Sequence, residues 1–192
     1  MAALQPSPSA ALPPKLEHFL SQGPPPVYLG FGSMTDPHPA DTTRCLLEAV
    51  RLAGCRAVVS RGWAALGEGP LPEGVMVVDG VDHAALFPRL AAVVHHGGAG
   101  TTTAAARAGA PQVIIPQHYD QPYFAQRIDE LGIGTGHAAG APAADSLTRA
   151  LARALAPDVA ARARSIASAM LGDGAERAAA QLIRGPRPAA RG

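Results

Sequence analysis

The sequence lacks an excess of charge of either sign and lacks a long uncharged apolar segment. Its 16 Lys and Arg residues nearly balance its 15 Asp and Glu residues, and the basic residues form no dense cluster. A nucleic acid backbone requires such a cluster, so we expect no nucleic acid partner. No stretch of about 18 residues is both apolar and uncharged, and the N-terminus has no basic segment before an apolar run. We therefore expect neither a transmembrane segment nor a secretory signal.

Cysteine and aromatic residues are also scarce. The two cysteines, Cys45 and Cys55, lie ten residues apart without the spacing of a metal site, and aromatic residues make up only 4% of the chain. We interpret both cysteines as buried thiols and expect a cytoplasmic protein, because thiols stay reduced in that compartment. The hydrophobic fraction of 47%, rich in Ala, indicates a globular α/β protein rather than a disordered chain.

Proline marks the ends of the chain. Residues 1–14, MAALQPSPSAALPP, are too rich in Pro to hold a helix or strand and are predicted to be a flexible linker or tail. Residues 186–192 are predicted to be a frayed C-terminal tail. The stretch between them, residues 15–185, has the size of a single domain.

Within this domain, short apolar runs alternate with segments of helical period. The predicted strands are 27–31, 55–60, 75–78, 91–96 and 112–116, and the predicted helices are 41–53, 101–109, 122–131, 145–156 and 158–184, with a break at 172–174. This alternation predicts the α/β fold class with a doubly wound, mostly parallel sheet. The unbroken apolar strands agree, because both faces of such a sheet are covered. Gly54 and Gly132 are predicted to end two helices in the left-handed conformation.

The turn HHGGAGTT at 95–102 lies between a predicted strand and a predicted helix. Such turns lie at the carboxyl ends of parallel strands, where ligands bind. Its glycines let backbone N–H groups approach an anion, the helix directs its positive end there, and His95 and His96 add ring donors. The turn therefore indicates a diphosphate site. The alternative is a purely structural turn, in which Thr101 caps the helix and one histidine is a satisfied buried residue.

Five strings taken together resemble one known family. They are VYLGFGSM at 27–34, SRGW at 60–63, VDHAALFPRLAAVVHH at 81–96, HHGGAGTT at 95–102 and DQPYFAQR at 120–127. In order and spacing they resemble the C-terminal, donor-binding domain of family 1 glycosyltransferases, in particular the sterol and macrolide or glycopeptide antibiotic branch. The resemblance covers residues 15–185 and implies a Rossmann-like half-domain of the GT-B fold.

The resemblance also implies roles for individual residues. Positions that surround the donor diphosphate in the family are matched here by Gly32, Ser33, His96, Gly97, Gly98, Gly100, Thr101 and Thr102. Trp63 and Val81 match positions near the nucleobase and ribose, and Asp120 and Gln121 match a pair that binds hydroxyls of the donor sugar. Two alternatives remain: Trp63 packs against the protein, and the Asp120–Gln121 pair only caps a helix.

For function, the resemblance implies binding of a UDP- or dTDP-hexose and inverting transfer of the hexose to an acceptor hydroxyl. The general base of the family comes from the N-terminal domain, so no catalytic base is assigned, and the motif requires no metal or other cofactor. The acceptor is expected to be held by an N-terminal domain or a separate chain that this sequence lacks. At Asp82, Ala84 and Ala85 the sequence departs from the family pattern, which leaves the base preference open.

Two alternatives of other classes stay open. One is a non-catalytic donor-binding subunit or a truncated fragment of a larger enzyme. The other is an NAD-binding dehydrogenase domain, because Gly98 and Gly100 begin a G-x-G-like turn and Asp120 follows 20 residues later, near the place of a ribose-binding acid. Against the dehydrogenase, Thr103 stands where the third glycine is needed, and the turn follows a late strand.

Overall fold

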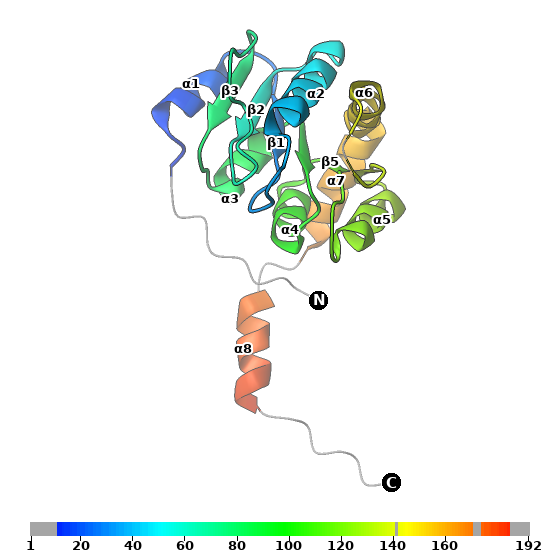
Figure 1. The fold of residues 1–192 in the computed structure, drawn as a ribbon. Coiled ribbons are helices and arrows are strands. Elements are labelled where there is room, and N and C mark those ends of the chain that lie inside the picture. The colour runs from blue at the N-terminus through cyan, green and yellow to red at the C-terminus, as the bar shows by residue number, and fades with distance from the viewer. Residues whose placement is uncertain (1–10, 141, 171–173, 185–192) are drawn as a thin grey trace.

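The computed structural model describes residues 11–140, 142–170 and 174–184, and in these ranges it shows a parallel sheet with helices on both faces (Figure 1). The strands are β1 (Val27–Gly30), β2 (Ala57–Ser60), β3 (Val75–Val78), β4 (Ala92–His95), β5 (Gln112–Ile114) and β6 (Gly134–Gly136). The helices are α1 (Pro14–Ser21), α2 (Pro39–Leu52), α3 (His83–Leu86), the 3-10 helix η1 (Phe87–Arg89), α4 (Ala99–Ala108), α5 (Gln121–Leu131), α6 (Ala144–Ala154), α7 (Pro157–Ala169) and α8 (Gly174–Arg184). The predicted α/β fold class is confirmed.

The order of the strands places a ligand crevice near the middle of the sheet. The strands are ordered β3-β2-β1-β4-β5-β6, and every neighbouring pair is parallel. Val27 of β1 lies opposite Ala57 of β2 on one side and opposite Ala92 of β4 on the other. The strand order therefore reverses between β1 and β4. In open α/β sheets this reversal opens a crevice at the carboxyl ends of the two strands, where ligands bind.

Alternate residues of the central strands face opposite sides of the sheet and bury two layers of helices. On one face Val27 packs in a cluster with Leu46 of α2 and Leu151 of α6. On the other face Tyr28 packs with residues of α1, α3 and α4, while Ile114 of β5 packs against α5 and α7. The sheet is thus covered on both faces, as the unbroken apolar strands predict.

Four elements of the described structure are absent from the sequence-based prediction: α1, α3, η1 and β6. α3 has four residues, too few to show a helical period. β6 reads Gly-Thr-Gly and has no apolar run, yet it pairs with β5. A Cβ added to Gly134 would lie 2.1 Å from the carbonyl oxygen of Gln112. The segment is a strand because its backbone lies close to the backbone of β5, which the absence of side chains at its glycines allows. The pattern of apolar residues in the sequence does not reveal this contact.

The structure corrects the predicted boundary between the N-terminal tail and the domain, because residues 12 and 14 belong to the folded part. α1 begins at Pro14, and Leu12 is only 7% exposed in a core cluster that includes Leu16. Proline is compatible with a first helical turn, because its missing N–H would have no intrahelical partner there. The predicted tail residues 1–10 and 186–192 lie outside the described residues.

The other helices lie within a few residues of their predicted positions. Gly54 and Gly132 have φ values of 65° and 67°, so both helix ends adopt the predicted left-handed conformation. α4 begins at Ala99, two residues before the predicted start. Figure 1 shows α8 standing apart from the sheet, and its Leu182 and Ile183 are exposed. Within the described ranges, no helix has the length and apolar character needed to cross a membrane.

Candidate functional site

The turns that follow β1 and β2 interlock at the edge of the central crevice. Gly32, after β1, has a φ of 60°, and its carbonyl oxygen accepts a hydrogen bond from the N–H of Trp63 at 3.0 Å. Gly62 lies against the same carbonyl, where an added Cβ would be 2.6 Å from the oxygen. The shape of this edge therefore depends on two glycines. Gly62 was not among the predicted site residues, although it lies in the SRGW string that contributed to the resemblance.

The His96 ring lies between two glycine turns. A Cβ added to Gly32 would be 3.3 Å from His96 Cε1, and a Cβ added to Gly98 would be 2.5 Å from Nε2. The His96 side chain is 9% exposed, and its Nδ1 is buried without a hydrogen-bond partner among the described residues. Burial lowers the pKa of His96, and the charge of Asp120 partly offsets this effect. The imidazole is therefore neutral at neutral pH, with one ring nitrogen unpaired. Buried polar atoms normally have partners, so the unpaired nitrogen marks this place as unusual.

His95, in contrast, is completely buried and hydrogen bonded at both ring nitrogens. Its Nδ1 accepts a hydrogen bond from the N–H of Gly97 at 3.1 Å, and its Nε2 lies 3.0 Å from Gln112 Oε1. Because the Gly97 N–H can only donate, Nδ1 is the acceptor and the ring proton is on Nε2. Burial lowers the pKa of His95 to about 3. The interpretation of one histidine as a satisfied structural residue is thus correct for His95.

The N-terminus of α4 points to the same place as His96. Gly98 occupies the N-cap position and the helix begins at Ala99, so the alternative in which Thr101 caps the helix is wrong. Thr102 is buried, and its hydroxyl donates a hydrogen bond to the carbonyl oxygen of Gly98 at 2.9 Å. The Thr102 hydroxyl is therefore used within the helix. This end of α4 carries the positive end of the helix dipole, which favours a nearby negative charge.

The three glycines of the turn have different structural roles. Gly97 has a φ of 94°, and a Cβ there would meet Ile114 Cγ2 at 2.7 Å, so both backbone conformation and packing require glycine. Its N–H points inward to His95 rather than outward. Gly98 has an ordinary φ of −62°, and its missing side chain leaves room for the His96 ring. At Gly100 an added Cβ would meet no atom within 4 Å.

Asp120 and Gln121 begin α5 and differ in burial. Asp120 is exposed and occupies the N-cap position of α5, as the helix-cap alternative has it, but its carboxylate makes no cap hydrogen bond. Gln121 is 3% exposed, and its Oε1 accepts hydrogen bonds from the N–H groups of Gln117 and His118 at 2.7 and 3.0 Å. Gln121 Nε2 lies 3.6 Å from Met34 Sδ, in the loop after β1. Gln121 therefore organises the loop after β5 and links it to the loop after β1.

Trp63 and Val81 lie in the turns that follow β2 and β3. Trp63 is 73% exposed, so the alternative in which it packs against the protein is wrong. Val81 is half-buried against the cluster that contains Leu86. Asp82, which departs from the family pattern, has a local structural role, since its carboxylate accepts a hydrogen bond from the N–H of Ala84 at 2.8 Å and caps α3.

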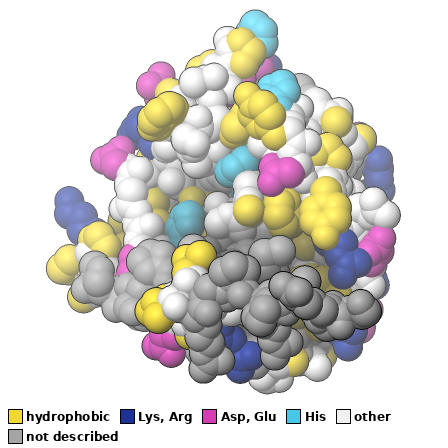
Figure 2. Space-filling view, turned by 90° about the horizontal axis from the view of Figure 1, so that it is seen from below, with side chains coloured by type: hydrophobic (Ala, Val, Ile, Leu, Met, Phe, Trp, Pro, Cys, Tyr) yellow, Lys and Arg dark blue, Asp and Glu magenta, His cyan; other side chains and the backbone are white. Residues whose placement is uncertain are grey.

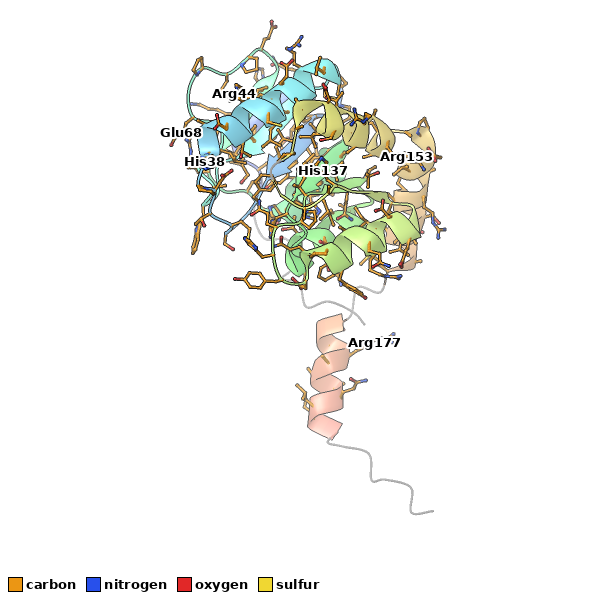
Figure 3. All side chains as sticks on the ribbon, turned by 45° about the vertical axis from the view of Figure 1, so that its right-hand side comes forward. His38, Arg44, Glu68, His137, Arg153 and Arg177 are labelled. Carbon is orange, nitrogen blue, oxygen red and sulfur yellow. The ribbon has the colours of Figure 1, made fainter. Side chains whose placement is uncertain are left out.

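A cavity of about 410 Å³ adjoins this site on the side of α2. Its lining comes from the loops after β1 and β5, from the first turns of α2 and from the segment before α6, and includes Asp36, His38, Cys45 and His118. Figure 3 shows His38 at the start of α2. The sequence analysis missed this cavity, because its residues come from one helix and several loops that are far apart in the chain. In the described part of the chain, no group of three or more His, Cys, Asp or Glu side chains could hold a metal ion.

Figure 2 views the molecule from below, the side on which the loop after β1 lies in Figure 1. Histidine side chains and an acidic side chain gather near the middle of this face around a hollow. The face therefore combines groups that donate hydrogen bonds with groups that accept them.

Comparison with known proteins gives one family. Residues 58–186 match the family model described as Erythromycin biosynthesis protein CIII-like, C-terminal domain. The chain is 51% identical over 175 residues to the vancomycin aglycone glucosyltransferase of Amycolatopsis orientalis, an alignment that covers 90% of this chain and 42% of the relative. It is 39% identical over 119 residues to a sterol 3-beta-glucosyltransferase of Arabidopsis thaliana, covering 61% of this chain and 19% of the relative. The chain thus spans less than half the length of these curated relatives.

Solved structures share the fold. The glycosyltransferase VinC, crystallised in complex with dTDP, superposes with a TM-score of 0.69 at 30% identity and covers 92% of this chain and 44% of that chain. The glycosyltransferase SnogD from Streptomyces nogalater gives a TM-score of 0.68 at 26% identity, covering 96% of this chain and 49% of that chain. The predicted GT-B half-domain is confirmed by this likeness.

Proposed function

Because this chain belongs to the family of EryCIII-like C-terminal domains of glycosyltransferases, we propose that it binds a UDP- or dTDP-linked hexose as the donor of a glycosyl transfer. The observation that carries this proposal is the buried, neutral imidazole of His96, whose Nδ1 has no partner among the described residues. It lies against Gly32 and Gly98, next to the N-terminus of α4. Helix N-termini favour anions through their N–H groups and dipole, and a diphosphate suits this place.

In this proposal the diphosphate lies between the loops after β1 and β4. Gly32 and Ser33 face it from one side, while His96 and the first turn of α4, with Thr101, face it from the other. Gly97 and Thr102 hold the turn in shape, in agreement with their hydrogen bonds. The diphosphate gains negative charge as its bond to the anomeric carbon breaks. Fixed N–H donors and a ring N–H of His96 would stabilise that charge in the transition state.

The rest of the donor extends to both sides of the diphosphate in this proposal. The exposed ring of Trp63 offers a face on which the nucleobase can stack, and Val81 lies in the turn after the neighbouring strand β3. On the other side, the Asp120 carboxylate accepts hydrogen bonds from sugar hydroxyls. Gln121 adds a donor through Nε2, since its oxygen already binds two backbone N–H groups.

Transfer also requires a part that holds the acceptor. The curated relatives are more than twice as long as the portion this chain matches. We propose that an N-terminal domain or a separate chain supplies the acceptor site and its general base, and that the displacement inverts the anomeric carbon. No metal or other cofactor has a role in the proposal. We also propose a cytoplasmic location, which the free thiols of Cys45 and Cys55 support.

Calorimetric titration of the folded chain with UDP, dTDP and NAD tests the proposal. Binding of UDP or dTDP in preference to NAD is the expected result. Absence of binding for both UDP and dTDP would overturn the proposal, and preferential binding of NAD would favour the dehydrogenase alternative.

The pH dependence of the same titration tests His96 directly. A bound diphosphate raises the pKa of the imidazole, since a nearby negative charge favours the charged ring. The complex then binds more protons than the free chain, so affinity should rise as the pH falls through and below the ordinary imidazole value of 6.5. The ligand phosphate also titrates near this range, at about 6. His96→Gln controls for that effect, and equal pH profiles in the two proteins would contradict the role of His96.

A further inference from the structure

Two polar side chains lie within an apolar layer beneath α4. His95 at the end of β4 and Gln112 at the start of β5 are both 0% exposed, and their neighbours Val93 and Ile114 are apolar. Burying polar groups costs free energy, and Gln112 Nε2 has no hydrogen-bond partner among the described residues. Replacing both members of such a pair by apolar side chains of similar shape is often neutral for stability. Stability alone is therefore a weak reason for this pair.

The hydrogen bonds of the pair lead to the turn that carries His96. Gln112 Oε1 accepts from Nε2 of His95 at 3.0 Å, and His95 Nδ1 accepts from the N–H of Gly97 at 3.1 Å. The second bond joins a side chain to the backbone N–H two residues later, in the manner of an Asx turn. This bond therefore closes a small hydrogen-bonded ring that includes the backbone of His96. Within that ring Gly97 adopts a φ of 94°, which is the change of direction that leads into α4.

We propose that Gln112 and His95 are positioning residues for the anion site, through the chain of bonds from Gln112 to His95 to the Gly97 N–H. Gln112 holds the His95 tautomer in which Nδ1 accepts, and His95 holds the Gly97 N–H inward. This hold fixes both the direction of the His96 ring and the start of α4 at Ala99. The identification of the anion as a nucleoside diphosphate rests on the proposed function.

Gln112 affects the turn at Gly97 through the tautomer of the His95 ring. If the ring proton of His95 moved to Nδ1, it would face the N–H of Gly97, donor against donor, and the turn would open. A protonated ring would have the same effect, and burial in this apolar layer, which lowers the pKa of His95 to about 3, opposes it. The Gln112 oxygen favours the one tautomer that leaves Nδ1 unprotonated.

Four variants separate positioning from general stability. His95→Leu removes both hydrogen bonds, while His95→Asn keeps an acceptor near the position of Nδ1. Gln112→Met removes the bond that selects the tautomer. Val113→Ala is the matched control, because Val113 is buried on the same strand but packs in the cluster on the opposite face of the sheet.

The first measurement is the affinity of each folded variant for UDP and dTDP by calorimetry. His95→Leu is expected to lose about tenfold or more in affinity, as for a lost hydrogen bond, and His95→Asn to recover most of that loss. Gln112→Met should lie between them. Val113→Ala should lower the melting temperature without changing the affinity. An affinity in His95→Leu equal to wild type, or an equal loss in Val113→Ala, would overturn the proposal.

The second measurement needs no nucleotide. ¹⁵N NMR is expected to show the Nε2–H tautomer of His95 in the wild type, and hydrogen exchange to show a protected Gly97 N–H. Protection should be lost in His95→Leu, weakened in Gln112→Met and kept in His95→Asn. If the wild type binds neither nucleotide, the proposed function fails and exchange alone decides. Full protection of Gly97 in both His95→Leu and Gln112→Met would then overturn the positioning role.

Discussion

The Asp120 carboxylate acts on its surroundings through charge rather than through a cap on its own helix. It makes no side-chain cap hydrogen bond at α5, yet its charge raises the pKa of His96 against the effect of burial. An exposed carboxylate in this position is available to hydroxyl groups of a ligand. Gln121, its neighbour, has a second role in the protein, because its oxygen holds the loop after β5. The two residues should therefore be tested separately.

Asp120→Ala is expected to separate recognition of the sugar from recognition of the nucleotide. The variant should bind UDP or dTDP about as well as the wild type, because the carboxylate is assigned to hydroxyls of the sugar and not to the nucleotide. It should lose the additional affinity for the matching nucleotide sugar, about 1–3 kcal/mol for one or two hydrogen bonds. Titration with nucleotide and nucleotide sugar, compared as a thermodynamic cycle, measures this difference.

Glu130→Ala is a suitable control for Asp120→Ala. It removes a carboxylate from the other end of α5, where Glu130 forms an exposed ion pair with Arg127. This control should bind both ligands like the wild type. If Asp120→Ala weakens nucleotide and nucleotide sugar equally, the assignment of Asp120 to the sugar is wrong.

At the scale of elements, the ends of the helices depend on glycines in the left-handed conformation. Gly54 follows α2 with a φ of 65°, and Gly109 follows α4 with a φ of 68°. Their surroundings differ: a Cβ at Gly54 would meet no atom within 4 Å, whereas a Cβ at Gly109 would lie 3.2 Å from Arg164 Cα of α7. The two positions therefore separate backbone strain from helix packing.

Gly54→Ala is expected to lower the free energy of unfolding by about 1 kcal/mol, the cost of a left-handed alanine. Gly109→Ala should cost more, because it adds a collision between α4 and α7 to the same strain. Gly54→Asn should recover part of the loss, since Asn tolerates this conformation better. Urea denaturation of the three variants measures these differences. Equal losses for Gly54→Ala and Gly109→Ala would show that the contact with Arg164 relaxes freely.

For the whole molecule, burial of histidines links folding to pH. Burial lowers the pKa of His83, His95 and His96 below the ordinary value of 6.5, and that of His95 to about 3. As the pH falls below 6.5, these rings take up protons in the unfolded chain before they do so in the folded chain. The unfolded state then binds more protons, so the fold loses stability as the pH falls.

His95→Asn is expected to be less sensitive to acid than the wild type. Between pH 6.5 and about 3, His95 contributes a slope of up to roughly 1.4 kcal/mol per pH unit to the free energy of unfolding. The variant lacks this component and keeps those of His83 and His96. Urea denaturation at several pH values gives both slopes. Parallel slopes for wild type and variant would mean that His95 does not remain neutral in the folded protein.

The sequence by itself determined the fold class, the family and most helix positions, and it directed attention to the turn after β4 as a candidate site. Apolar strands that alternate with helices predict a parallel sheet. The apolar runs of the strands and the helical spacing of apolar residues can both be recognised within short windows of the sequence. The Gly-rich turn after β4 and the strings around it identified the family, and Gly54 and Gly132 lie in left-handed turns as their positions after helices predict. These features depend on residues that are close in sequence.

Only the tertiary structure decided how the two histidines divide their roles. His95 ends β4 and His96 follows it directly, but Gln112, 17 residues after His95 on β5, satisfies His95, while His96 lies between Gly32 and Gly98. Tertiary contacts also made Gly134–Gly136 a strand, and they buried Leu12, which precedes the predicted start of the domain. In each case the deciding contact joins segments far apart in the chain. Local pattern cannot encode such a contact, because it depends on which strands become neighbours in the sheet.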